Sequence, residues 1–394
     1  MIMIKKNDVK TTVQIHSQAK LEFYEAYLNR YLRILCHAKP IKRINIYDVF
    51  CGMGIYDDGG KGSPIIAFDI IKNILLNENL RKTGTQISLV VNDKDLQKIE
   101  RVKKYIELNN KENICKVEYY NNDIEQMFDI IKKEVACTVP DTRNIIFIDP
   151  YGYKNIKKEI LYQLMDNHRT EIILFLPISH MHRFTQKAIH DEEAIQYEPL
   201  RIFIASFFDA SHRMAKEQLH VMDYIDFITE ALKFGEFHAV SYYIERDAAN
   251  YFALFFISSH IYGFEKILEV KWQLDEDAGR GFRIPPMQKD LFETVIAEEE
   301  KERNVAKLEA ILSSFLAEPK DNKQVYEETL KHGFLPKHAV EVFTKWKSIS
   351  NDFKIYNIKT KVETKKGGFY ISHTNYNENP KVLFRKETHE NNKN

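Results

Sequence analysis

The sequence predicts an α/β protein in which a doubly wound, mostly parallel sheet ends in an antiparallel hairpin and a C-terminal α+β module follows. Two observations carry this prediction. Between residues 44 and 178, short apolar runs alternate with amphipathic stretches, a pattern typical of parallel strands joined by helices. Near residue 280 the chain becomes rich in Gly, Pro and charge, and short helical stretches and a strand pair follow.

The elements can be assigned in order. An amphipathic helix is expected over residues 16–37, where Leu and Tyr recur at three- and four-residue steps before Pro40. Ser63 and Pro64 mark the start of a second helix. Strands are expected at 44–50, 86–93, 116–123, 144–150 and 170–178, helices between them at 63–77, 95–109, 125–137 and 157–167, and a hairpin of β-branched and aromatic runs at 238–246 and 250–259.

The change of pattern defines the expected domains. The C-terminal part offers three short helices and then a strand pair within 353–373, which is the order of a winged-helix-like module. The predicted boundaries are a main domain at 1–275 with a mostly helical insertion at 180–220, a linker at 276–300, a winged-helix-like domain at 301–373 and a flexible tail at 374–394.

Composition restricts the classes of function. The formal net charge is +0, so any contact with nucleic acid must come from a local patch; residues 301–394 hold 18 Lys and Arg against 12 Asp and Glu. No segment has the apolar length of a signal peptide or a membrane span, which predicts a cytoplasmic protein without membrane contact. The four cysteines are widely spaced and form no C-x-x-C pair, so neither a disulfide framework nor a metal site is expected.

A glycine turn follows the first strand, in the run DVFCGMGIYDDGG that begins at Asp48. Gly52 and Gly54 would let the backbone pass close to a ligand at the carboxyl end of the strand. A dinucleotide fingerprint requires a third glycine where this chain has Asp57, which disfavours NAD.

Carboxylates stand at the ends of the next three expected strands. Asp93 ends the second strand, where it could accept both hydroxyls of a ribose, and Asp123 ends the third, where it could accept an adenine amino group. Asp149 ends the fourth. Each of them alone is more simply a turn residue, but four successive strand ends would bring these side chains to one crevice.

The run Asp149-Pro150-Tyr151 resembles the D-P-P-Y motif of amino-methylating nucleic-acid methyltransferases, with Tyr in place of the second Pro. The resemblance implies that Asp149 accepts a hydrogen bond from a target amino group, that the Pro150 carbonyl accepts another, and that Tyr151 stacks on a base. A simple strand-to-helix turn is the alternative interpretation.

Several segments together resemble the three-Cys-motif partner proteins, a family with a class I methyltransferase-like domain. They are H-S-x-x-K-L-E-F-Y-E-A-Y-L from residue 16, D-V-F-C-G-M-G-I-Y-D-D-G-G-K-G-S-P from residue 48, F-I-D-P-Y-G-Y from residue 147, and Y-F-A-L-F-F-I-S-S from residue 251. The resemblance covers residues 11–275. It implies a Rossmann-like fold that binds S-adenosyl-L-methionine (SAM), and an iron–sulfur-type three-Cys-motif protein, encoded nearby, as a partner.

The resemblance also implies roles for individual residues. Asp48, Gly52 and Gly54 would contact the methionine end of SAM, Asp93 its ribose and Asp123 its adenine. Lys20, in the first motif, could close over the cofactor, and a solvated helix face is the alternative. Asp149, Pro150 and Tyr151 would face the methyl acceptor.

These observations favour a SAM-dependent methyltransferase that acts on nucleic acid, with a base amino group as the acceptor. A non-catalytic SAM-fold partner or scaffold protein is one alternative, and a small-molecule methyltransferase whose 180–220 insertion forms a lid is another. Candidate contacts to the nucleic-acid backbone are Lys354, Lys359, Lys361, Lys365 and Lys366; an exposed, solvated strand edge would also explain these lysines.

Overall fold

The computed structural model describes residues 15–77, 84–191, 193–209, 212, 217, 219–247, 250–275, 279–283, 304–349, 352–364 and 368–386. Contacts within the chain divide it into two compact units, residues 1–260 with 281–284 and residues 261–280 with 285–394. This division differs from the predicted boundary at residue 275, because the helix over 261–274 groups with the C-terminal unit. Within the described ranges, no helix is long and apolar enough to cross a membrane.

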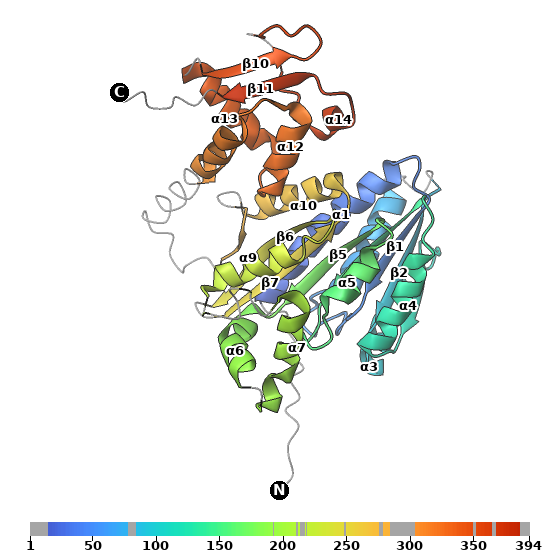
Figure 1. Ribbon diagram of the computed structural model, residues 1–394. Helices are drawn as coiled ribbons and strands as arrows, with labels where there is room; N and C mark the ends of the chain where they lie inside the picture. The colour runs from blue at the N-terminus through green and yellow to red at the C-terminus, as the bar shows by residue number, and fades with distance from the viewer. Residues whose placement is uncertain are drawn as a thin grey trace. The chain divides into compact units, whose positions relative to one another are not determined.

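The first unit is built on an eight-stranded sheet with the order β3-β2-β1-β4-β5-β7-β6-β8 (Figure 1). Strands β1 to β5 run parallel, whereas β7 is antiparallel to both β5 and β6. The predicted Rossmann-like methyltransferase sheet with an antiparallel terminal hairpin is therefore confirmed. The strands are β1 (Arg43–Asp48), β2 (Gln86–Asn92), β3 (Lys116–Tyr120), β4 (Thr142–Ile148), β5 (Thr170–Leu176), β6 (His238–Asp247), β7 (Asn250–Ser258) and β8 (Gly281–Phe282).

Helices cover both faces of this sheet, as alternation along the strands requires. On β4, Phe147 packs against Tyr24 of α1 at 4.5 Å between ring centroids, whereas Ile146 and Ile148 face the opposite side, toward α4 and α5. One face carries α1 (Ile15–His37), α2 (Ser63–Lys72) with the π-helical turn η1 (Asn73–Asn77), and α3 (Leu96–Asn109); the other carries α4 (Ile124–Ala136), α5 (Lys158–Met165), α6 (Ile178–His190), α7 (Glu198–Phe207) and α9 (Val221–Ala231).

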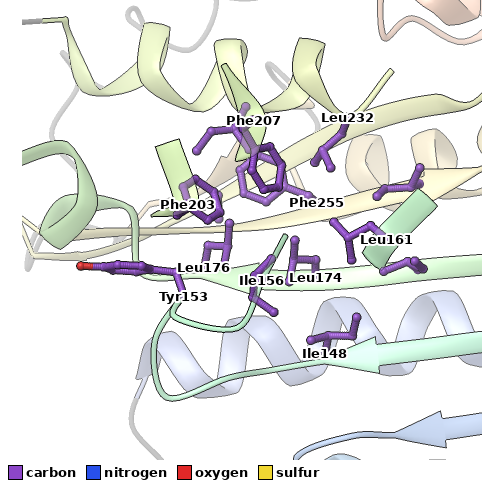
Figure 2. Packing of buried hydrophobic residues seen from close by; sticks show 14 of the residues in the cluster. Ile148, Tyr153, Ile156, Leu161, Leu174, Leu176, Phe203, Phe207, Leu232 and Phe255 are labelled. Atoms are coloured by element: carbon purple, nitrogen blue, oxygen red, sulfur yellow. The ribbon is translucent and has the colours of Figure 1, made fainter. Parts of the chain in front are cut away.

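The hydrophobic core on the second face includes the helices that follow β5. Figure 2 shows Phe203 and Phe207 of α7 close to Phe255 of β7. The rings of Phe203 and Phe207 stack on each other, with their centroids 4.3 Å apart. Tyr153 borders this cluster with its hydroxyl pointing away from it, and that hydroxyl lies 3.1 Å from His180 Nδ1. The helical segment within 178–207 is thus packed into the core of the first unit.

Helix α1 lies along β4 and β5 and runs antiparallel to them. From the end of α1 toward its start, side chains at successive turns contact strand positions that lie progressively closer to the carboxyl ends of the strands. The start of α1 therefore lies at the carboxyl edge of the sheet. In order, Tyr31 donates to the Asn144 carbonyl, Tyr27 donates to Glu171, Tyr24 packs on Phe147, and Lys20 pairs with Asp149.

The second unit combines helices with a three-stranded antiparallel sheet of order β10-β11-β9. Its core contains Phe343 and Trp346, which pack against Phe353 and Phe384. A capping box formed by Asp321 and Gln324 starts one of the helices. The elements are α10 (Ile261–Leu274), a helix over 304–315, β9 (Lys320–Asp321), α12 (Asn322–Lys331), α13 (Pro336–Ile349), β10 (Phe353–Asn357), α14 (His373–Tyr376) and β11 (Val382–Lys386).

The end of the chain differs from the sequence prediction in two respects. β10 pairs along its length with the later strand β11, and inside the predicted pair Tyr356 forms an isolated antiparallel bridge with Glu363. Residues 374–386, expected to be a flexible tail, contain the central strand of this sheet, because Val382 and Phe384 bury their side chains in the core of the unit. Residues 387–394 lie outside the described residues. The winged-helix-like assignment stays a prediction.

The role of β11 can be tested with two neighbouring substitutions. Phe384→Ala should lower the free energy of unfolding of the second unit by about 3–5 kcal/mol, because Phe384 is fully buried. Arg385→Ala, at an exposed position one residue further, should change it by less than about 0.5 kcal/mol. Denaturant unfolding of both variants measures the difference, and equal stabilities would show that this strand is not part of the core.

Candidate functional site

The glycine turn lies between the carboxyl end of β1 and the start of α2. Gly52 and Gly54 have φ angles of +59° and +68°, in the left-handed region that favours glycine. A Cβ at Gly54 would lie 2.4 Å from Val102 Cγ2 on α3, so packing requires glycine there. A Cβ at Gly52 would meet nothing within 4 Å. The turn therefore leaves open space beside the Gly52 backbone.

Asp48, the last residue of β1, has a buried and unsatisfied carboxylate. Its side chain is 1% exposed, and neither oxygen has a hydrogen-bond partner. Burial raises the pKa of Asp48 to about 7, and the Asp149 carboxylate raises it further, whereas Ser63, the Lys20 ammonium and the Phe50 backbone lower it. The Ser63 hydroxyl is near enough to influence this pKa but does not meet hydrogen-bond geometry. A buried charge without partners is costly, which is typical of a group that a ligand completes.

Asp93 joins the end of β2 to the glycine turn. Its Oδ2 atom accepts a hydrogen bond of 3.2 Å from the Gly52 amide, and its Oδ1 atom accepts one of 3.0 Å from the Asp95 amide. The Lys98 ammonium lies 3.5 Å from Oδ2. The carboxylate is 2% exposed, and these partners compensate its charge.

Asn92 holds the ends of three strands together, a role that the sequence analysis missed. Its Nδ2 atom donates to the Val49 carbonyl at 3.1 Å and to the Asn122 carbonyl at 3.2 Å, and its Oδ1 atom accepts from the Asn122 amide at 3.0 Å. The available signal was an amide side chain at the end of an otherwise apolar strand, directly before Asp93.

Asp123 caps a helix. Its exposed side chain accepts a 2.9 Å hydrogen bond from the Gln126 amide at the start of α4. This contact is a common function of Asp before a helix, so the observed geometry needs no ligand. The assignment of Asp123 to adenine stays a prediction.

Two of the three residues assigned to the acceptor, Asp149 and Tyr151, each contact a lysine. Asp149 forms an ion pair with Lys20, whose ammonium also lies 4.7 Å from the centre of the Phe175 ring. Tyr151 is 78% exposed, and its hydroxyl accepts a 2.7 Å hydrogen bond from Lys98. Pro150 stands between them and is half-buried. Lys20, expected near the cofactor, is thus paired with a residue expected to face the acceptor.

The cysteines are free thiols, and Cys51, within the glycine turn, is buried. Burial raises the pKa of the Cys51 thiol, and the carboxylates of Asp48 and Asp93 raise it further. This environment disfavours a thiolate nucleophile. In the part of the chain that the structure describes, no group of three or more His, Cys, Asp or Glu side chains could hold a metal ion.

The lysines proposed for nucleic-acid contact belong to the second unit. Lys354 lies on β10, and Lys359 and Lys361 are exposed in the turn that follows this strand. Lys365 and Lys366 lie outside the described residues.

No protein-family model and no curated protein sequence matches this chain. Solved structures resemble it weakly. An O-methyltransferase from Bacillus cereus in complex with SAH is 10% identical, with a TM-score of 0.30, over 59% of this chain and 80% of that one. The O-methyltransferase TomG from Streptomyces achromogenes, in complex with SAM, is 10% identical, with a TM-score of 0.31, over 62% and 87%.

Trm1 from Pyrococcus horikoshii, in complex with SAM, is 12% identical, with a TM-score of 0.34, over 68% of this chain and 62% of its own length. This chain therefore spans less than two thirds of Trm1. The similar structures are SAM-dependent methyltransferases, and at these scores their acceptors have no bearing on the acceptor of this chain.

The unsatisfied Asp48 carboxylate makes stability depend on pH. The unfolded chain releases the Asp48 proton near pH 3.8, whereas the folded protein keeps it until about pH 7, so raising the pH between these values favours unfolding. Asp48→Asn removes this cost. The variant should therefore gain stability relative to the parent above pH 7, on the order of 2–4 kcal/mol more than at pH 4.

Thermal or denaturant unfolding of both proteins from pH 4 to 8 measures this difference. Asp129→Asn, at an exposed carboxylate on α4, is a control that should show no comparable gain with rising pH. A difference between the Asp48→Asn variant and the parent that stays constant across this pH range would contradict a raised pKa at Asp48.

Proposed function

We propose that this chain is a SAM-dependent methyltransferase that binds SAM across the carboxyl ends of β1 and β2. One observation carries the proposal: the buried, unpartnered carboxylate of Asp48 lies beside the open glycine turn of Gly52. Both lie at the carboxyl end of β1, between β2 and β4, where the direction of the strand order reverses. In open α/β sheets, ligands bind at this topological switch point.

The residues of the crevice fit the chemistry of the cofactor. The methionine end of SAM carries an ammonium group, which suits the Asp48 carboxylate, and the Gly52 backbone leaves room beside it. Asp93 has further acceptor capacity for ribose hydroxyls, because a carboxylate offers about four lone-pair positions. Bound SAM supplies a methyl group on a positively charged sulfur, which is already activated for transfer.

The protein's part in such a transfer is to orient the acceptor and to exclude water. For the acceptor we propose a base amino group of a nucleic acid. Asp149 would accept a hydrogen bond from the amino group, and the Pro150 carbonyl would accept another. The exposed ring of Tyr151 offers a stacking surface for the base. Lys354, Lys359 and Lys361 would contact the nucleic-acid backbone, a contribution that high salt weakens.

A non-catalytic role is favoured by one specific observation. The Asp149 carboxylate, which would have to receive the acceptor, is already paired with Lys20. A stable ion pair at this position suits a SAM-fold protein that binds a partner, such as an iron–sulfur-type three-Cys-motif protein, and transfers no methyl group. Membership in the three-Cys-motif partner family belongs to the same proposal. A protein that binds SAM but methylates neither DNA nor RNA would support this second function.

The cofactor site can be tested at the glycine turn. Gly52→Val should abolish SAM binding measured by calorimetry, because the side chain fills the open space beside the backbone. Gly235→Val is the matched control: Gly235 has a φ of +61° and equally open surroundings, in the turn before β6. Both variants should lose about 1–2 kcal/mol of stability. Unchanged SAM affinity in Gly52→Val would refute this site.

The acceptor site can be tested at Asp149. Asp149→Ala removes the oxygen that would accept a hydrogen bond from the target amino group, so it should reduce methyl transfer at least about 100-fold with SAM affinity nearly unchanged. Tyr151→Ala should weaken acceptor binding by about 1–3 kcal/mol. Asp57→Ala, at an exposed carboxylate, is the control.

Transfer of labelled methyl groups from SAM to DNA and RNA fractions measures these effects. Full transfer by Asp149→Ala would exclude the assigned role of this carboxylate. If the parent protein binds SAM and transfers nothing to either fraction, the non-catalytic function takes precedence.

A further inference from the structure

Tyr24 has a buried hydroxyl without a partner. This residue lies on the inner face of α1, its side chain is 0% exposed, and its hydroxyl makes no hydrogen bond. The next tyrosines of the same helix differ, since Tyr27 donates to Glu171 and Tyr31 donates to the Asn144 carbonyl. Buried hydroxyl groups are normally satisfied, so the exception at Tyr24 requires an explanation.

The Tyr24 side chain lies beside Asp48. Its ring packs on Phe147 of β4, and Phe147 is the direct neighbour of Asp48 in the pairing of β1 with β4. Directly paired residues of adjacent strands point to the same face of a sheet. One turn earlier on α1, Lys20 reaches Asp149, two residues beyond Phe147, which fixes the direction of the helix over the strand ends.

The Asp48 carboxylate also acts electrostatically on the Tyr24 hydroxyl. Burial raises the pKa of the Tyr24 hydroxyl, and the Asp48 carboxylate raises it further. Yet no hydrogen bond joins them. Helix α1 and strand β1 thus bring the Tyr24 phenol oxygen and the Asp48 carboxylate to the same buried region. Neither group has a hydrogen-bond partner there.

We propose that Tyr24 and Asp48 together bind the α-ammonium group of the methionine end of SAM, so that Tyr24 is a further cofactor-binding residue. This inference rests on the proposed function. An ammonium group brings three N–H donors for the carboxylate and phenol oxygens, and its positive charge compensates the buried carboxylate. A water molecule would satisfy the hydrogen bonds but would bring no positive charge to the Asp48 carboxylate, on which Lys20 acts only through its charge. The nearby ammonium of Lys20 is already paired with Asp149.

The test compares two ligands on two variants by calorimetry. SAH carries the ammonium group, and its deaminated analogue keeps the nucleoside, the sulfur and the carboxylate but lacks this group. Tyr24→Phe should weaken SAH binding about 10- to 100-fold, the range expected for one hydrogen bond to a charged group. The same variant should bind the deaminated analogue within about twofold of the parent.

Tyr31→Phe is the matched control on the same helix. Its hydroxyl is bonded in the free protein, 3.4 Å from the Asn144 carbonyl at the opposite edge of the sheet. This variant should lose thermal stability and keep the SAH affinity of the parent. Tyr24→Phe should lose no stability, since its hydroxyl has no partner to give up.

The outcomes separate the inference from the proposed function. If the parent binds SAH but Tyr24→Phe weakens both ligands equally, or neither, Tyr24 does not contact the ammonium group and only the inference fails. A destabilised Tyr24→Phe would show that the hydroxyl has a partner in the free protein and would also overturn it. If the parent protein does not bind SAH, both the inference about Tyr24 and the proposed function fail.

Discussion

The packing of α1 along β4 determines the chemical environment of the crevice. Toward its N-terminus, α1 contacts β4 and β5 at positions that lie progressively closer to their carboxyl ends, so the position of Tyr31 at one edge of the sheet fixes that of Lys20 at the other. An N-terminal segment thereby covers strand ends that lie more than a hundred residues later in the sequence. The burial of Asp48 depends on this cover, because Tyr24 packs on the strand beside it.

Two buried carboxylates of this sheet, Glu171 and Asp48, differ in their hydrogen bonding. Glu171, at the amino end of β5, is 7% exposed, and burial raises its pKa to about 7; it accepts hydrogen bonds from Tyr27 and Ser258. Burial raises the pKa of Asp48 to a similar value, but Asp48 has no hydrogen-bond partner. Glu171 therefore belongs to a hydrogen-bond network with Tyr27 and Ser258, whereas no hydrogen bond offsets the desolvation of Asp48. Such local violations concentrate at functional sites.

Much of the fold and part of the site could be predicted, because they depend on local patterns. Apolar runs next to Asp48, Asp93 and Asp149 predicted the parallel strands. Their order also predicted that these carboxylates lie at the carboxyl edge of the sheet. The ion pair of Lys20 could not be predicted, because its partner depends on how α1 packs. The central strand around Phe384 was missed, because its three apolar residues stand among polar ones and are stabilised by tertiary contacts.

One side chain, Lys98, takes part in both halves of the crevice. Its ammonium lies 3.5 Å from Asp93, donates a 2.7 Å hydrogen bond to the Tyr151 hydroxyl, and lies 4.7 Å from the centre of that ring. A ligand that binds Asp93 competes with this ammonium and thereby alters what holds Tyr151. Ligand binding at Asp93 is then thermodynamically coupled to ligand binding at Tyr151, and this coupling acts equally in both directions. In the proposed function, this shared lysine would link cofactor binding at Asp93 to the mobility of the Tyr151 ring that is assigned to the acceptor.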